Sequence, residues 1–318
     1  MVRQKYVIPS PLLRNNFAVP DRGKRKKKEE VLLENVYGRI KIRCNGNFSI
    51  TPTDMKNYIA ALNCIYDQIH SFANKDQRWN FHQVGSQNGF YISFSDLIRY
   101  RGLKHHGKIY SSIEKSLEKL HLTNIKLENS YPELSSNKER QRVEQFYLIE
   151  KISIEKTKKD ITNNYVISIK VPAFITQALL NKTNSCIAVE KEIINSLDGV
   201  AFNLYWTVLN NSFSNKKDQI TFSWDYWINQ SNFLSSNSGR KRPREAKDKI
   251  RKALNRLQKN GGIYFFQEKI LSDNRKALSV KVVPKIEDKK TPMEIEATNM
   301  EIEATNMEIE ATNGSLSI

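Results

Sequence analysis

The sequence predicts an α+β protein built from two winged helix-turn-helix domains in tandem. An extended segment, a helix, a loop, a second helix and strand-like segments follow one another over 91–171 and again over 219–283. The phrases Ile-Ser-Phe-Ser and Ile-Thr-Phe-Ser stand at matching places, 92–95 and 220–223. The formal net charge is +17 over 318 residues, which favours a polyanionic partner. The alternative is two helical bundles with incidental hairpins.

Residues 1–34 are expected to form a basic N-terminal arm. Residues 1–30 carry nine basic and three acidic side chains, with an uninterrupted basic run over 24–28. Such a segment suits contacts with phosphates, although a solvated basic stretch that aids solubility is the alternative.

The first winged-helix domain is expected over 35–185. Thr53 or Asp54 begins a helix that completes its core, and Ser95 caps the helix that follows the extended segment at 91–94. A second helix places Ile113 on its apolar face, and strands follow at 122–128, 146–154 and 165–171. Lys104 precedes this second helix, and its opposite face carries the candidate DNA-binding residues Lys108, Ser111, Lys115 and Lys119.

The second winged-helix domain is expected over 186–285. Asp198 precedes a core helix, Ser223 caps the next helix, and Pro243 lies in the first turn of the helix expected to enter DNA. Two glycines end that helix at 261–262, and a hairpin follows over 263–283. Its apolar stripe comprises Ala246, Ile250, Ala253, Leu254 and Leu257.

The helix from Pro243 carries the strongest candidate site, because residues 240–259 hold ten basic and two acidic side chains. Arg244 and Arg251 are expected to read guanine, and Asn255 adenine, in the major groove. Phosphate contacts are expected from the residues just before the helix, Arg240, Lys241 and Arg242. Two further candidate DNA-binding residues are Lys252, on the face opposite the apolar stripe, and Lys247, which flanks the stripe and whose alternative is a solvated side chain. The alternative for each of these side chains is a surface position without a partner.

Residues 286–318 are expected to form a disordered acidic tail. They carry eight acidic and two basic side chains, and Met-Glu-Ile-Glu-Ala-Thr-Asn occurs three times over 293–313. The apolar positions of this repeat do not form a helical seam. A tethered acidic segment could compete with nucleic acid for the basic surface.

We expect no enzymatic activity, no metal and no cofactor. The chain lacks a phosphate-binding glycine-rich loop, a zinc-ligand pattern and a Gly-x-Ser-x-Gly elbow. None of its five histidines forms the His-apolar-His pair of metal-dependent nicking enzymes. A secretory signal and a membrane span are also not expected, so the protein is placed in the cytoplasm.

Several segments, taken in order, resemble plasmid replication initiators of the TrfA type. The similar segments are Ile8–Arg14, Ile40–Arg43, Tyr91–Ser95, Asn164–Pro172 and Ala201–Trp206. The resemblance implies binding as a monomer to direct repeats (iterons) in double-stranded DNA at a plasmid origin, followed by opening of an AT-rich segment. It also implies recruitment of the host initiator and the replicative helicase, and a homodimer as an inactive or autoregulatory form. Two alternative functions are a transcriptional regulator that binds a promoter and a nicking enzyme.

Overall fold

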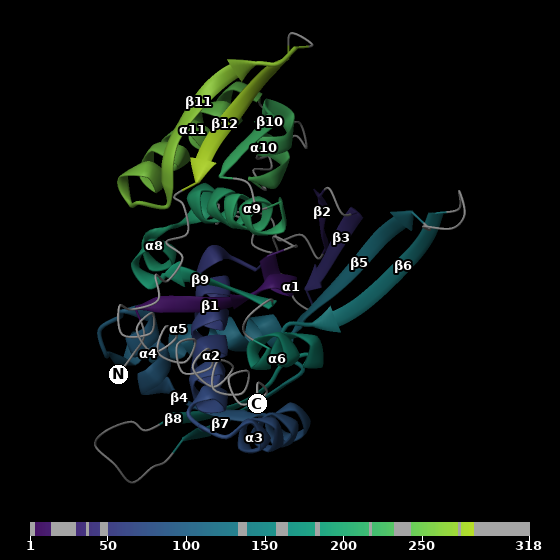
Figure 1. The fold of residues 1–318 in the computed structure, drawn as a ribbon. Helices are drawn as coiled ribbons and strands as arrows, with labels where there is room; N and C mark the ends of the chain where they lie inside the picture. Colours follow the sequence, from purple (N-terminus) through teal and green to yellow (C-terminus); the bar gives the residue numbers. More distant parts are fainter. Residues whose placement is uncertain are drawn as a thin grey trace, which may run out of the picture. The chain divides into compact units, whose positions relative to one another are not determined.

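A computed structural model describes residues 4–13, 30–35, 38–44, 50–132, 139–156, 165–181, 185–215, 218–231, 243–272 and 275–282 (Figure 1). The chain divides into one compact unit over residues 1–282 and a second unit over 283–318. The predicted acidic tail falls in the second unit and lies outside the described residues, as does the basic run at 24–28.

The helices and strands alternate along the chain in an α+β protein, which confirms the predicted class. The helices are α1 Ser10–Leu13, α2 Pro52–His70, α3 Lys75–Asn88, α4 Phe94–Arg101, α5 Gly107–His121, α6 Ala173–Leu180, α8 Lys191–Ser196, α9 Gly199–Asn215, α10 Trp224–Gln230 and α11 Pro243–Lys259. The strands are β1 Lys5–Pro9, β2 Glu30–Asn35, β3 Gly38–Cys44, β4 Phe90–Ser93, β5 Thr123–Pro132, β6 Glu139–Tyr147, β7 Lys151–Lys156, β8 Tyr165–Lys170, β9 Cys186–Glu190, β10 Gln219–Ser223, β11 Ile263–Ile270 and β12 Lys276–Val282.

Two antiparallel three-stranded sheets share one strand order. In the first, β8 lies between β4 and β7, and in the second, β12 lies between β10 and β11. In each, the first strand leads directly into a helix and pairs with the last strand of the following hairpin. Ser93 and Ser223 cap these helices, because each hydroxyl accepts a hydrogen bond from a backbone amide, at 3.1 Å from Asp96 and 3.3 Å from Tyr226. The predicted cap at Ser223 is confirmed, whereas the first helix begins before the expected Ser95 because Phe94 is already helical and buried.

The strands of the first half differ from the prediction at one point. The strand expected at 146–154 is interrupted at the buried residues Leu148 and Ile149, where the Tyr58 hydroxyl donates a 2.6 Å hydrogen bond to the Leu148 carbonyl. The chain therefore leaves one sheet and enters another. β5 and β6 join β2 and β3 in a separate four-stranded sheet, and only β7 forms the hairpin with β8.

The segment from β1 through α1 belongs to the core and not to an exposed arm. β1 pairs with β9, and Tyr6, Ile8 and Leu12 are fully buried or nearly so. The Asn63 side chain accepts a 2.7 Å hydrogen bond from the Val7 amide and donates a 3.1 Å bond to its carbonyl, so the other edge of β1 is also satisfied. The prediction of an exposed arm over 1–34 is therefore wrong for residues 5–13, because apolar side chains of this segment are buried in the core. β2, within the same range, is a strand from residue 30.

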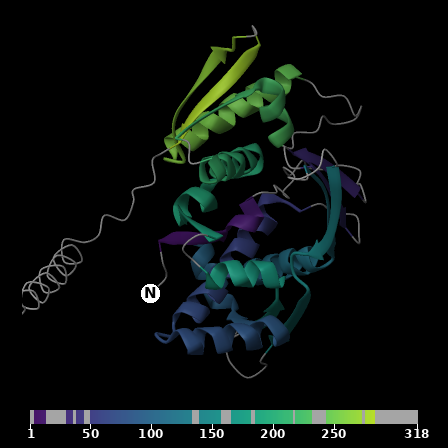
Figure 2. The ribbon, with the colours of Figure 1, turned by 45° about the vertical axis from the view of Figure 1, so that its right-hand side comes forward.

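One buried apolar cluster runs through both halves of the compact unit. α2 contributes most of one half, with Tyr58, Leu62 and Ile65 fully buried, and α9 contributes Phe202 and Trp206 to the other. Figures 1 and 2 show the paired strands β1 and β9 lying between α2 and α9. Both predicted domains therefore lie within the same compact unit.

Candidate nucleic-acid interface

Helix α11 packs one face into the core and turns the opposite face outward. Its predicted apolar stripe is buried, from Ala246 through Leu257. Gly261, two residues after the last residue of the helix, has a left-handed conformation (φ 74°), as the sequence predicts for the end of this helix. Arg244, Lys252 and Asn255 are exposed on the outer face. The first turn of α11 and its outer face thus present two positive side chains and one amide to solvent.

Arg251, the second predicted base reader, has partners within the chain. Its guanidinium donates to Glu268 of β11 at 2.8 and 2.9 Å and to Asp248 at 3.0 Å. It also lies over the indole of Trp224, with 5.2 Å between the guanidinium carbon and the ring centre, beside Lys247 at 5.3 Å. The hydrogen bond with Glu268 raises the pKa of Arg251 above its usual value. Arg251 is therefore a fixed and partly neutralised cation, with 40% of its side chain exposed.

Only some of the other candidate DNA-binding residues around α11 lie among the described residues. Lys247 is half-buried over Trp224, and Lys252 is exposed. Arg240, Lys241 and Arg242 lie outside the described residues.

Helix α5 carries a weaker positive face. Lys108, Ser111 and Lys115 are exposed along it, and Lys104 is exposed in the turn before it. The three residues of α5 lie on its predicted outer face, because Ile113 and Leu117 are buried on the opposite side, and Lys104 precedes the helix as predicted.

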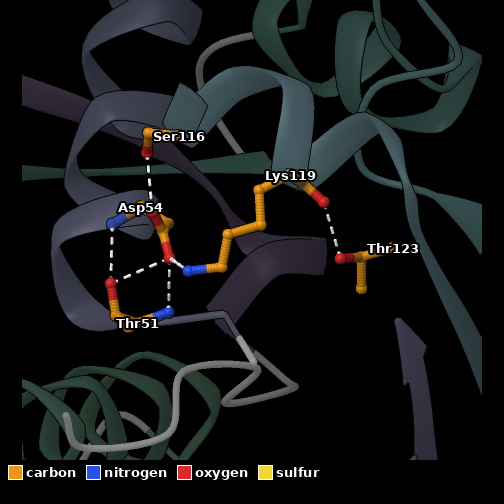
Figure 3. A network of polar contacts seen from close by, with 5 residues as sticks. All are labelled: Thr51, Asp54, Ser116, Lys119 and Thr123. Carbon is orange, nitrogen blue, oxygen red and sulfur yellow. Dashed lines mark hydrogen bonds and ion pairs between the residues drawn. The ribbon is translucent and has the colours of Figure 1, made fainter. Parts of the chain in front are cut away.

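Lys119 is predicted to lie on the same face. In the structure its side chain instead points into the interior of the first half. Its ammonium forms an ion pair with Asp54, the N-terminal acid of α2 (Figure 3). Only 18% of the Lys119 side chain and 8% of the Asp54 side chain are exposed. The assignment of Lys119 as a DNA contact is corrected, because its charge is used to neutralise a buried carboxylate.

Asp54 gathers three further hydrogen bonds. Its carboxylate accepts from the Thr51 amide at 2.7 Å, from the Thr51 hydroxyl at 2.8 Å and from the Ser116 hydroxyl at 2.8 Å. The Thr51 hydroxyl in turn accepts from the Asp54 amide at 3.3 Å, which completes a capping box at the start of α2. The first turn of α2 is thereby held against α5, the helix that carries the exposed lysines.

The end of the β11–β12 hairpin adds basic residues that the sequence analysis did not select. Lys269, Arg275 and Lys276 are exposed around it. Nearer the base, the Lys281 ammonium lies 5.5 Å from the ring centre of the exposed Tyr264. The basic residues that flank positions 272–274, in the middle of the predicted hairpin, could have indicated this end of the hairpin as a contact surface.

The described ranges hold no group of three or more His, Cys, Asp or Glu side chains that could bind a metal ion. Among the same residues, no helix has the length and apolar character needed to cross a membrane.

Comparison with known proteins gives a match in structure alone. No protein-family model matches the chain, and no curated protein sequence matches it. Domains 2 and 3 of RctB, a replication initiator, superpose with a TM-score of 0.54 at 16% identity, covering 87% of this chain and 99% of that one. A second crystal structure of RctB domains 2–3 gives a TM-score of 0.48 at 14% identity, covering 85% and 95%. The chain therefore has the fold of these two initiator domains. This similarity does not identify the chain as an initiator of the TrfA type.

Proposed function

We propose that the protein initiates DNA replication by binding double-stranded DNA through two winged helix-turn-helix domains. The observation that carries this proposal is the repeated architecture. A sheet with the strand order first–third–second occurs twice, and each sheet accompanies a helix with an exposed basic face. The fold similarity to RctB domains 2 and 3 supports an initiator over other DNA-binding proteins.

In this proposal α11 enters the major groove with its N-terminal end. Arg244 and Asn255 contact base edges, because both are exposed on the outer face and have the donor geometry for guanine and adenine. Lys252 and the basic end of the β11–β12 hairpin contact phosphates and fix the register. α5 enters a neighbouring groove with Lys108, Ser111 and Lys115.

Arg251 reads a base only when DNA replaces its internal partners. Glu268 and Asp248 hold its guanidinium in a defined position before DNA arrives. A guanine edge presents two acceptors that can replace the carboxylate oxygens, whereas another base at the same position does not present this pair. We therefore assign Arg251 to sequence discrimination and not to general affinity.

The resemblance to TrfA-type initiators supplies the finer steps of the proposal. The protein binds iterons at a plasmid origin as a monomer, bends and opens the adjoining AT-rich duplex, and recruits the host initiator and the replicative helicase. A homodimer serves as the inactive or autoregulatory form, and no cofactor, metal or covalent chemistry takes part. The site of action is the cytoplasm.

The DNA next to the gene provides the direct test. The full-length protein is bound to overlapping fragments of that DNA at several salt concentrations, and a fragment with gene and repeats is tested for autonomous replication. We expect salt-sensitive binding to direct repeats and replication of the fragment. Specific binding at a promoter without replication would instead support a transcriptional regulator. A covalent protein–DNA product formed with Mg²⁺ or Mn²⁺ would establish a nicking enzyme, and binding without any preference would refute sequence reading.

A further inference from the structure

The connection between the two proposed DNA-binding domains is held from both sides. The segment 195–198, which we call the junction, comprises the last two residues of α8 and the two residues before α9, near the start of the second domain. Residues of α2 and α4 in the first domain and of α11 in the second all bond to it. A flexible linker would leave these backbone groups to water, so the contacts distinguish the junction from an ordinary domain linker.

The contacts from the first domain are partly or wholly buried. The Lys56 ammonium of α2 donates to the carbonyls of Asn195, at 3.0 Å, and of Leu197. The Asn195 side chain donates to the Tyr100 carbonyl at 3.1 Å and accepts from the Tyr6 hydroxyl at 3.1 Å. The junction is thus anchored to α2, to the end of α4 and to β1.

The contacts from the second domain come from the C-terminal half of α11. The Arg256 guanidinium donates to the Ser196 carbonyl at 2.6 Å and to the Asp198 carboxylate at 2.5 Å. Asn260 adds a 2.9 Å hydrogen bond from its side-chain amide to the Ser196 hydroxyl. The proposed recognition helix is therefore tied directly to the segment that the first domain holds.

The position of Arg256 on α11 separates this contact from DNA binding. Arg256 follows Arg251 by five residues, so the two side chains point about 140° apart around the helix axis. Arg251 lies toward β11, whereas Arg256 lies toward the junction. The same helix can therefore contact DNA and the junction at once.

We propose that Arg256 is a positioning residue that sets the orientation of α11 relative to the first domain before DNA is bound. This inference rests on the proposed function. It implies that the protein accepts two half-sites at only one spacing, because one extra base pair moves the second half-site by about 3.4 Å and rotates it by about 35° around the duplex. A protein with independently moving domains would accept several spacings.

The test compares Arg256→Ala with Lys259→Ala in the full chain. Lys259 is exposed in the last turn of the same helix, so its replacement removes the same charge but not the junction contacts. Asp198→Asn weakens the same contact from the other side, because it removes the ion pair with Arg256 but leaves the hydrogen bond from Arg256 to the Ser196 carbonyl. The Asp198 side chain is 75% exposed, so this change should cost little stability.

The first measurement uses no DNA. Labels on Ser153→Cys and Gln267→Cys, with Cys44 and Cys186 replaced by serine, report the distance distribution between the domains. We expect one narrow distribution in the wild type and in Lys259→Ala, a clearly broader one in Arg256→Ala and one of intermediate width in Asp198→Asn. A broad distribution in the wild type, or no broadening in either junction variant, would overturn the inference.

The second measurement selects DNA sites with variable spacing from a random library. We expect wild type and Lys259→Ala to prefer one spacing over its one-base-pair neighbours by about tenfold or more, and Arg256→Ala to lose that preference while its affinity for a single half-site changes less than about twofold. Equal spacing preference in Arg256→Ala and Lys259→Ala would overturn the inference. If the wild type binds no DNA, the proposed function fails, and the distance measurement still decides whether Arg256 orients the domains.

Discussion

Replacing Lys119 by methionine should destabilise the protein without weakening DNA binding. Methionine keeps most of the volume of the lysine side chain but removes the positive charge beside Asp54. Breaking a buried ion pair costs about 3–5 kcal/mol when the remaining charge has no other partner. Here Asp54 keeps three hydrogen bonds, two from Thr51 and one from Ser116, and the pair is not wholly buried. We therefore expect a loss of about 2–3 kcal/mol in the free energy of unfolding.

Thermal unfolding and salt-dependent DNA binding measure the two effects separately. A loss of this size lowers the midpoint by roughly 4–10 °C for a unit of this size. Lys115→Met is the matched control, because Lys115 is exposed one turn earlier on α5. The control should change stability by less than about 0.5 kcal/mol and reduce the salt slope by about one phosphate contact.

The opposite pattern would refute the assignment of Lys119 to the interior. If Lys119→Met left the unfolding midpoint unchanged and reduced the salt dependence of DNA binding, Lys119 would be a DNA contact and not an interior ion-pair partner. A double variant, Asp54→Asn with Lys119→Met, adds a check on the pair itself. Its destabilisation should be smaller than the sum of the two single effects by about 1–2 kcal/mol, since neither variant side chain leaves an unpaired charge.

Three further outcomes follow from the second domain and the junction. Glu268→Gln should tighten binding to the specific repeat by about twofold to fivefold in filter-binding or anisotropy assays, because the Arg251 guanidinium no longer has to leave a carboxylate to contact a base; unchanged or weaker binding would contradict the proposed exchange of partners. Arg244→Ala should cost about 1–3 kcal/mol at one base position, whereas Lys252→Ala should weaken all sequences alike; equal profiles in a mismatch series would contradict base reading by Arg244. Burial, and secondarily the charge of Arg101, lowers the pKa of Lys56 from 10.5 to about 8. Through Lys56 the folded state binds fewer protons than the unfolded state between these values, so the contribution of Lys56 to stability should rise as pH increases from about 8 toward 10. The wild type should therefore gain stability relative to Lys56→Met over this range in denaturant titrations.

Local patterns predicted the second domain more accurately than the first. Ser223, Pro243 and Gly261 are signals that act within a few residues, and each lies where the sequence placed it. The apolar stripe of α11 is likewise a property of one helix. In the first domain, the strand expected at 146–154 is interrupted at the buried Leu148 and Ile149. The Leu148 carbonyl accepts a hydrogen bond from Tyr58, 90 positions earlier, and the local pattern gives no sign of this contact.

The candidate site shows the same division between local and distant effects. Helical spacing correctly placed Lys108 and Lys115 on the outer face of α5. It also placed Lys119 there, because no pattern within α5 shows that Asp54, 65 positions earlier, requires a cation. The restraint on Arg251 by Glu268 was hidden for the same reason, since that contact needs the register of a hairpin as well as a helix.

The pairing of β1 with β9 has a consequence for how the chain reaches its native state. Lys5 aligns with Glu190, so the first strand to leave the ribosome has no partner until nearly two hundred residues have been made. Contacts of such long sequence separation carry a large loop-closure cost and form late. The first half of the protein cannot seal its interior as an autonomous intermediate. Its final closure must coincide with synthesis of the segment that leads into the second half, which makes the two halves cooperative partners in folding.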